Sequence, residues 1–243
     1  AVTWQSVVLP YNVDAISLDS DRKDGNIDGK GNSLAGELIP DTLLYNGVPF
    51  VMGLEKAGEL NAISCNGQTV KLPMGNYDEL HIIRCSASSA IGSTFQIDQF
   101  EEFDIWLQDY AEPIGQWNNR LVSGKLNEEP DGIAPGYINR QPVAWYGSHR
   151  HLSNGENEAY RFTYLFAVNY IIEKGSRKLT LPQNPNMKIF AISVAQTPFA
   201  KTLTRVQPLY DELSSTLARV SADSSSFVGE CKVSMSSPNP GAM

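Results

Sequence analysis

An acidic, glycine-rich segment between Asp19 and Ser33 holds the densest group of residues that could bind a metal ion. Calcium takes about six to eight oxygen ligands from carboxylates, amides and backbone carbonyls, and this segment offers all three. Its second half begins like a helix–loop–helix calcium loop, but Ala35 stands at the twelfth position, where that loop needs a glutamate. We therefore predict a stabilising calcium site inside a β-domain, with these candidate ligands: Asp19, Asp21, Asp24, Asn26 and Asp28.

The same residues are also typical of ordinary turns. Asp, Asn and Gly accept left-handed backbone geometry, and the two polar types hydrogen-bond to their own backbone. Arg22 and Lys23 would neutralise part of the negative charge without any metal. The sequence leaves both interpretations open.

Two of the three histidines, His149 and His151, stand one residue apart. Side chains alternate between the faces of a strand, so both imidazoles would lie on the same face. That arrangement suits a metal pair or a sugar-binding pair, and two structural histidines are the alternative. The chain has no nucleophile elbow, zinc-protease motif, P-loop or dinucleotide fingerprint. These motifs therefore assign no catalytic residue. Paired carboxylates for glycoside chemistry would be distant in sequence, so whether the chain is an enzyme stays open.

Aromatic residues beside amides and charges form a candidate carbohydrate surface. Sugar rings stack on aromatic side chains, while polar groups hydrogen-bond to the hydroxyls. The predicted sugar-binding residues are Trp117, Trp145, Tyr146, His149, His151, Glu156 and Asn157. The alternative for each tryptophan is a place in the core, which is where we expect Trp4 and Trp106.

The elements that must position these residues are short strands separated by Gly, Pro, Asn and Asp, from Trp4 to about Val194. The chain lacks the strand–helix alternation of a parallel α/β sheet, so we predict an all-β antiparallel β-sandwich or jelly roll. The clearest expected strands are Val48–Met52, Glu79–Cys85, Ser93–Ile97, Phe103–Leu107, Arg161–Ile172 and Met187–Val194.

The pattern changes after this region. Leucines at four-residue spacing predict one C-terminal helix over Pro208–Val220, followed by a polar linker, Ser221–Ser226. Glu230–Met235 is a further strand candidate, and a lone strand cannot bury its own faces. We expect a β-sandwich domain over residues 1–200, a helix and linker over 201–225, and the start of a following domain or a tail over 226–243.

Composition excludes several classes of protein. The 243 residues are 42% hydrophobic and carry a formal net charge of −8, which argues against general binding to a nucleic-acid backbone. No apolar run reaches the roughly 18 residues that a membrane span needs. No signal peptide is visible at Ala1–Pro10, which lacks a basic start and an apolar centre. Cys65 and Cys85 could form a bridge or remain two buried free thiols.

Several segments, in this order, resemble a β-sandwich module of large bacterial carbohydrate-active enzymes. They are Asp21–Gly29, Ala35–Pro40, Gly47–Phe50, Gly67–Pro73, Ala144–His151, Gly155–Tyr160, Tyr164–Phe166 and Leu179–Pro182. The order is similar to that in the C-terminal region of bacterial α-mannosidase-like, Bacteroides-type glycoside hydrolases, over about residues 8–195. The resemblance implies an accessory domain of a secreted, extracytoplasmic glycosidase, with a glycan and the parent's catalytic domain as partners. It supplies no catalytic residue.

Three functional hypotheses follow from these observations. The first is a carbohydrate-binding or substrate-guiding module of a multi-domain glycoside hydrolase. The second is a structural domain that packs on a catalytic domain and binds no sugar. The third is a stand-alone enzyme.

Overall fold

The computed structural model of the chain describes residues 3–53, 58–98, 101–117, 121–122, 125–126, 135–138, 141–196, 219–222 and 233–236. Every element in these ranges is a β-strand except one 3-10 turn, η1 (Gly36–Leu38). The all-β prediction is therefore confirmed. All six strands expected from the sequence are present, with ends displaced by a few residues.

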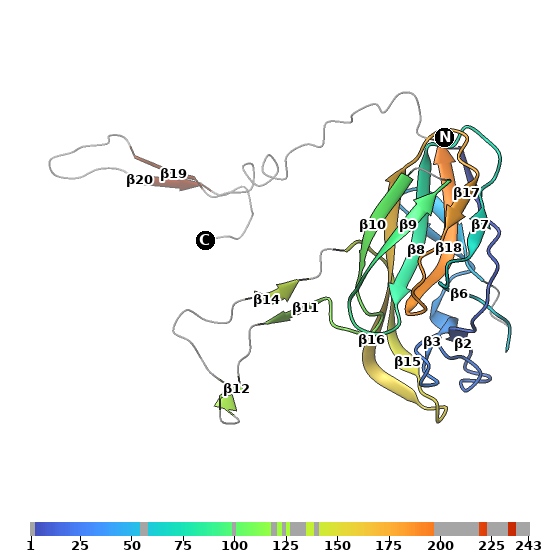
Figure 1. The fold of residues 1–243 in the computed structure, drawn as a ribbon. Coiled ribbons are helices and arrows are strands. Elements are labelled where there is room, and N and C mark those ends of the chain that lie inside the picture. The colour runs from blue at the N-terminus through green and yellow to red at the C-terminus, as the bar shows by residue number, and fades with distance from the viewer. Residues whose placement is uncertain are drawn as a thin grey trace. The chain divides into compact units, whose positions relative to one another are not determined.

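The larger sheet has eight strands (Figure 1). Its path runs through β1 (Thr3–Ser6), β18 (Met187–Gln196), β8 (Glu79–Ser86), β16 (Asn157–Ile171), β15 (Val143–His151), β3 (Ser33–Ala35) and β2 (Ile16–Ser17), and β6 (Ile63–Ser64) also pairs with β18. Neighbouring strands are antiparallel except β2 and β3, which run parallel. The long β15–β16 hairpin thus lies beside the β2–β3 pair, and this junction carries the candidate site.

A second sheet of four strands completes the sandwich. Its order is β10 (Glu101–Leu107), β9 (Ile91–Ile97), β17 (Lys178–Thr180) and β7 (Thr69–Lys71). A separate hairpin consists of β4 (Thr42–Tyr45) and β5 (Val48–Val51). Two small ladders join β11 (Gly115–Trp117) to β14 (Pro135–Ile138) and β12 (Leu121–Val122) to β13 (Lys125–Leu126).

The larger sheet is buried on both faces at its centre. Leu80 and Ile82 of β8 pack in one hydrophobic cluster with Phe95 and Leu179 of the smaller sheet. The alternate residues of β8, which point to the other face of the sheet, belong to a second cluster, and this cluster includes Phe50 of the β4–β5 hairpin. Central strands buried on both faces are continuously apolar, which explains why the alternation of apolar and polar residues is weak there.

The two described cysteines are free thiols, both buried. Cys65 belongs to the cluster between the sheets and Cys85 to the cluster on the other face of the larger sheet, which explains why they form no bridge. Burial raises the pKa of both thiols, that of Cys65 to about 12. Neither thiol is therefore ionised near neutral pH, so neither is a ready nucleophile.

The expectation that Trp4 and Trp106 lie in the core is wrong. Trp4 is 42% exposed and Trp106 is 64% exposed. In β10, Ile105 and Leu107 are buried, so strand alternation turns Trp106 outward.

Residues 200–243 form a second compact unit, distinct from residues 1–199. In it, β19 (Arg219–Ala222) pairs with β20 (Val233–Ser236), close to the expected Glu230–Met235 strand. The predicted helix and linker fall largely outside the described residues. Arg219 and Val220 nevertheless belong to a strand, so the helix does not reach its predicted end. In the part of the chain that the structure describes, no helix is long and apolar enough to cross a membrane.

Candidate metal centre

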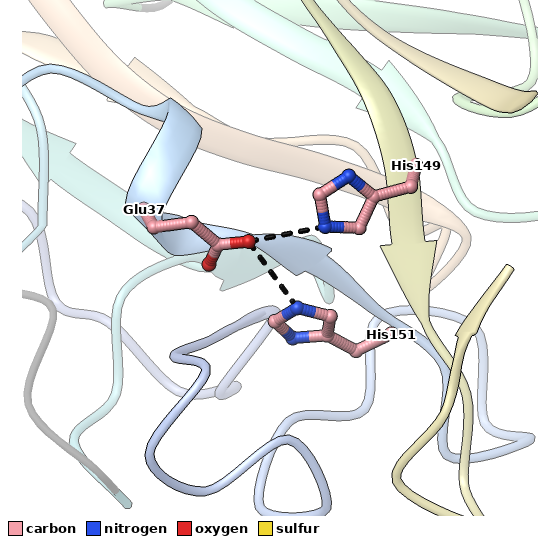
Figure 2. Close-up of side chains that lie close together, drawn as sticks. All are labelled: Glu37, His149 and His151. Carbon is pink, nitrogen blue, oxygen red and sulfur yellow. Dashed lines mark hydrogen bonds and ion pairs between the residues drawn. The ribbon is translucent and has the colours of Figure 1, made fainter. Parts of the chain in front are cut away.

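Two histidines of β15 and a glutamate of η1 converge at the junction of β15 with β3. Figure 2 shows the side chains of His149 and His151 pointing toward the Glu37 carboxylate. Glu37 Oε1 lies 3.1 Å from Nε2 of His149 and 3.5 Å from Nε2 of His151. The ligand atoms of the three residues all lie within 4.8 Å of one another. Among the described residues, this is the one group of three His, Cys, Asp or Glu side chains with that geometry.

Trp145 holds the turn that carries Glu37. Its side chain is only 8% exposed, and its indole Nε1 donates a hydrogen bond to the carbonyl oxygen of Leu38, 2.9 Å away. Gly147 allows this placement, because a Cβ there would lie 2.7 Å from Cη2 of the Trp145 ring. The Trp145 ring thus fixes η1 against β15. Glu37 of η1 then faces His149 and His151, which follow Trp145 by four and six residues in the same strand.

His151 is fully buried, and a hydrogen bond between one of its ring nitrogens and a serine hydroxyl orients the ring. Its Nδ1 lies 2.8 Å from the hydroxyl of Ser17 in β2, which in turn contacts the hydroxyl of Ser33 in β3. His151 is in register with Ser33 on the neighbouring strand. With Nδ1 engaged by a hydroxyl, the Nε2 atom is directed into the cluster.

The Nε2 atom of His151 is in an unusual position. It is buried and has no hydrogen-bond partner among the described residues. Two carboxylate oxygens nevertheless face it, Glu37 Oε1 at 3.5 Å and Asp19 Oδ1 at 3.6 Å. Burial lowers the pKa of the His151 imidazole below its usual value, an effect that outweighs the opposing influence of the two carboxylates.

The distances between these atoms suit one small metal ion. Two ligand atoms of a tetrahedral zinc ion lie about 3.3 Å apart, because each is about 2.0 Å from the metal. The separations of 3.1 Å and 3.5 Å around Glu37 Oε1 are close to that spacing. Two imidazoles and a carboxylate are ligands of zinc and related divalent transition metals, whereas calcium prefers oxygen alone.

The acidic loop, by contrast, uses most of its oxygens in its own turns. Asp21 accepts the backbone N–H of Lys23, Asn26 that of Gly31, and Asp28 those of Lys30 and Asn32. In the described part of the chain, no three of the predicted calcium-binding carboxylates have ligand atoms within 4.8 Å of one another. Asp19 lies by His151 and Arg22, while Asp24 accepts the N–H of Gly58. The calcium site remains a prediction.

Asp24 keeps one feature that favours a cation. Its Oδ1 is buried and has no hydrogen-bond partner in the described part of the chain, and the same holds for Oδ2 of Asp14. Burial raises the pKa of Asp14, and the nearby negative charge of Asp24 adds to the effect. A cation near these two carboxylates would bind the buried oxygens and neutralise the repulsion between the two negative charges.

Asp28 belongs to a separate polar network. Its Oδ2 accepts hydrogen bonds from the Asn32 amide at 2.8 Å and the Tyr110 hydroxyl at 3.1 Å. Arg150 donates to the Tyr110 hydroxyl at 2.7 Å and to Glu158 at 2.6 Å. The loop is therefore fixed to the β15–β16 hairpin without a metal at this end.

The predicted sugar-binding residues do not form one surface. Trp145 is in the core, so its assignment as a stacking platform is wrong. Tyr146 is 65% exposed on the opposite face of β15 from Trp145. Glu156 and Asn157 are exposed near the turn that joins β15 to β16, and the side chain of Trp117 lies outside the described residues. Asn157 is opposite His151 in the β15–β16 register but is exposed. Of the predicted residues whose side chains the structure describes, His149 and His151 are the two that face a common partner, Glu37.

Sequence reasoning missed Glu37 and Ser17. Glu37 is 112 residues from His149 and Ser17 is 134 residues from His151, so no local spacing links them. The signal in the sequence was the His-x-His pair, which indicates two ligands of a metal site but does not identify the carboxylate that joins them.

Comparison with known proteins identifies a family for this chain. A family model described as an AziU2-like β-sandwich domain matches residues 3–198. No curated protein matches the chain.

Proposed function

This chain belongs to the family of AziU2-like β-sandwich domains, and within that fold we propose that it binds one divalent transition-metal ion through His149, His151 and Glu37. The ion would join β15 to η1 and so tie the β2–β3 region to the rest of the larger sheet. The domain would then be a metal-binding module whose loops are held by the ion.

The observation that carries this proposal is the environment of His151 Nε2. A buried nitrogen faces two carboxylate oxygens, at 3.5 Å and 3.6 Å, and has no hydrogen-bond partner among the described residues. An N–H at this position would not complete a good bond, because ordinary N–H···O distances are about 2.7–3.2 Å. A metal ion among the three residues would bind the nitrogen and neutralise the carboxylates.

The Nδ1 atoms of the two histidines also support the proposed metal binding. Nδ1 of His151 contacts the Ser17 hydroxyl and Nδ1 of His149 contacts the Ser148 hydroxyl, at 2.8 Å and 3.2 Å. Metal-binding histidines nearly always donate a hydrogen bond from the non-coordinating nitrogen, to a carboxylate, a backbone carbonyl or water, which fixes the tautomer and the ring orientation. Serine hydroxyls take that place here. His151 Nε2 is then available as a ligand, whereas His149 Nε2 would exchange its 3.1 Å contact with Glu37 Oε1 for the metal.

The test is a zinc titration of tag-free protein that has been stripped of metal. We expect one zinc ion per chain and a rise in melting temperature, since a ligand at about 100 times its dissociation constant adds about 2.7 kcal/mol of stability. His149→Ala should abolish tight binding. His81→Gln is the matched control, because His81 pairs with Glu79 outside the cluster and its loss should leave zinc binding unchanged. Wild-type protein that binds no zinc at micromolar concentration would refute the proposal.

A second candidate function is carbohydrate binding, as an accessory domain of an extracytoplasmic glycoside hydrolase. Exposed aromatic side chains on the β15–β16 hairpin favour it. Tyr146, Phe162 and Tyr160 are 65%, 43% and 89% exposed. Tyr146 is opposite Tyr164 in the strand register, so Phe162 lies diagonally from Tyr146 on the same face. The exposed rings of Tyr146 and Phe162 on one face form the kind of surface on which sugar faces stack.

Calorimetric titration of the chain with mannans, N-glycans and plant polysaccharides would test this second function. Binding in the micromolar to millimolar range corresponds to about −8 to −4 kcal/mol. Tyr146→Ala should weaken binding and leave the melting temperature nearly unchanged. Absence of heat with every glycan at millimolar concentration would favour a purely structural domain that packs on a catalytic partner.

A further inference from the structure

We infer that Asp19 is the fourth ligand of the centre formed by His149, His151 and Glu37, and that Arg22 competes with the metal for it. This inference rests on the proposed metal binding. It assigns to two residues of the acidic loop a role in the transition-metal centre.

Asp19 stands at the edge of the cluster. Its Oδ1 is 3.6 Å from Nε2 of His151, a separation similar to the 3.5 Å between that nitrogen and Glu37 Oε1. Asp19 is nevertheless outside the group of three whose atoms all lie within 4.8 Å of one another. Its side chain is 52% exposed, so it has room to rotate toward an ion held by the other three residues.

Arg22 holds Asp19 in its present position. The Nε and Nη2 atoms of Arg22 lie 2.7 Å and 2.6 Å from the same Oδ1 atom of Asp19. Arg22 also donates from Nη1 to the carbonyl oxygen of Gly155, in the turn between β15 and β16, at 3.5 Å. Its own carbonyl oxygen accepts from the Ser17 hydroxyl, 3.4 Å away. Arg22 is therefore fixed beside the centre, where its positive charge opposes the entry of a cation.

The number of ligands decides what kind of centre this is. Three protein ligands leave a position open for water or a substrate, as in catalytic zinc sites, whereas four protein ligands close the coordination shell, as in structural sites. With Asp19 the set becomes two imidazoles and two carboxylates. The inference thus assigns a closed, structural centre, reached when Asp19 leaves Arg22 for the metal.

The experiment compares zinc affinity in metal-free wild type, Asp19→Asn, Arg22→Gln and Asp21→Asn, by competition with a chromogenic chelator at low ionic strength. Asp21→Asn is the matched control, because Asp21 is an exposed acid of the same loop whose carboxylate accepts a hydrogen bond from the Lys23 backbone N–H. We expect Asp19→Asn to weaken binding by about tenfold or more, since even outer-shell partners are worth about 10–100-fold. Arg22→Gln should tighten binding, and Asp21→Asn should change it by less than about twofold.

Cobalt substitution gives a second readout. Four-coordinate cobalt in wild type should absorb strongly in the visible range, and Asp19→Asn should change that spectrum while the melting temperature of the metal-free protein stays constant. An Asp19→Asn affinity equal to that of Asp21→Asn would overturn the inference and leave the three-residue centre in place. Failure of wild type itself to bind zinc would overturn the proposed function instead. Unchanged or weaker binding in Arg22→Gln would remove the role of Arg22.

Discussion

Ser17 and His151 are 134 residues apart in the sequence, yet the Ser17 hydroxyl lies 2.8 Å from Nδ1 of His151. The contact spans β3, because β2 pairs with β3 and β3 pairs with β15. It determines which ring nitrogen of His151 faces Glu37. The orientation of the proposed metal ligand therefore depends on the short parallel pair at the end of the larger sheet.

Replacing Ser17 with alanine should weaken zinc binding. Loss of such a supporting contact typically costs about 10–100-fold in metal affinity. Ser148→Ala is the comparison, because the Ser148 hydroxyl contacts His149 Nδ1 at an exposed site where water can replace it. Chelator competition should show a much smaller loss for Ser148→Ala. Equal affinities for the two variants would mean that the Ser17 contact does not orient a ligand.

Trp145 should behave as a core residue and Tyr146 as a surface residue. Truncating a buried tryptophan to alanine costs about 3–5 kcal/mol. A surface substitution is usually within about 0.5 kcal/mol of neutral. We therefore expect Trp145→Ala to lower the free energy of unfolding in urea severely and Tyr146→Ala to leave it nearly constant. Trp145→Phe removes the hydrogen bond to Leu38, worth about 1 kcal/mol, together with part of the buried ring, and should cost less than Trp145→Ala. A mild effect of Trp145→Ala would contradict its structural role.

Asp28 should make the domain sensitive to acid. Burial alone would raise the pKa of its carboxyl, but hydrogen bonds from Asn32, Lys30 and Tyr110 bring the pKa below the usual value of 3.8. A carboxyl with a lowered pKa in the folded state stabilises the fold above its unfolded-state pKa, and this contribution is lost as the pH falls through the folded-state pKa. The free energy of unfolding should therefore decrease below about pH 4.

Urea unfolding of wild type and Asp28→Asn between pH 7 and pH 3 measures this contribution. Asp28→Asn should be less stable than wild type at pH 7, and its free energy of unfolding should fall less steeply toward pH 3. Tyr110→Phe removes one of the hydrogen bonds and should give an intermediate slope. If the free energy of unfolding of wild type and of Asp28→Asn falls equally steeply with pH, the acid sensitivity belongs to other carboxyls.

The predicted calcium site is tested by melting the protein in excess calcium and in chelator. If the folded loop binds calcium, the melting temperature should rise with calcium, because a ligand of the folded state stabilises it. Asp24→Asn should reduce the rise, since the Asp24 carboxylate keeps a buried oxygen with no hydrogen-bond partner among the described residues. Identical melting curves in both conditions, with no calcium found by elemental analysis, would remove this site and leave the turn interpretation.

Sequence patterns predicted the strands well because strand signals are local. Phe103 and Ile105 flank Asp104, so the start of β10 shows the apolar–polar alternation of a strand. Strand alternation past Ile105 places Trp106 outside, whereas the general tendency of aromatic residues in a sandwich to lie in the core predicted the opposite. Trp145 shows the opposite error, since only the close approach allowed by Gly147 and the partner carbonyl of Leu38 bury its ring. The candidate site was half visible: His149 and His151 share a face by spacing, whereas Glu37 joins them through strand order, which no local pattern encodes.

The short strands at the two ends of the larger sheet affect how the protein behaves in concentrated solution. β2 has two residues and β1 has four. A long, flat edge strand exposes a row of unpaired backbone groups to which another chain can add, and natural sheets avoid this by ending in very short strands. Each end of this sheet offers only a few such groups. Self-association by strand addition is therefore disfavoured at both ends, whatever the occupancy of the metal centre.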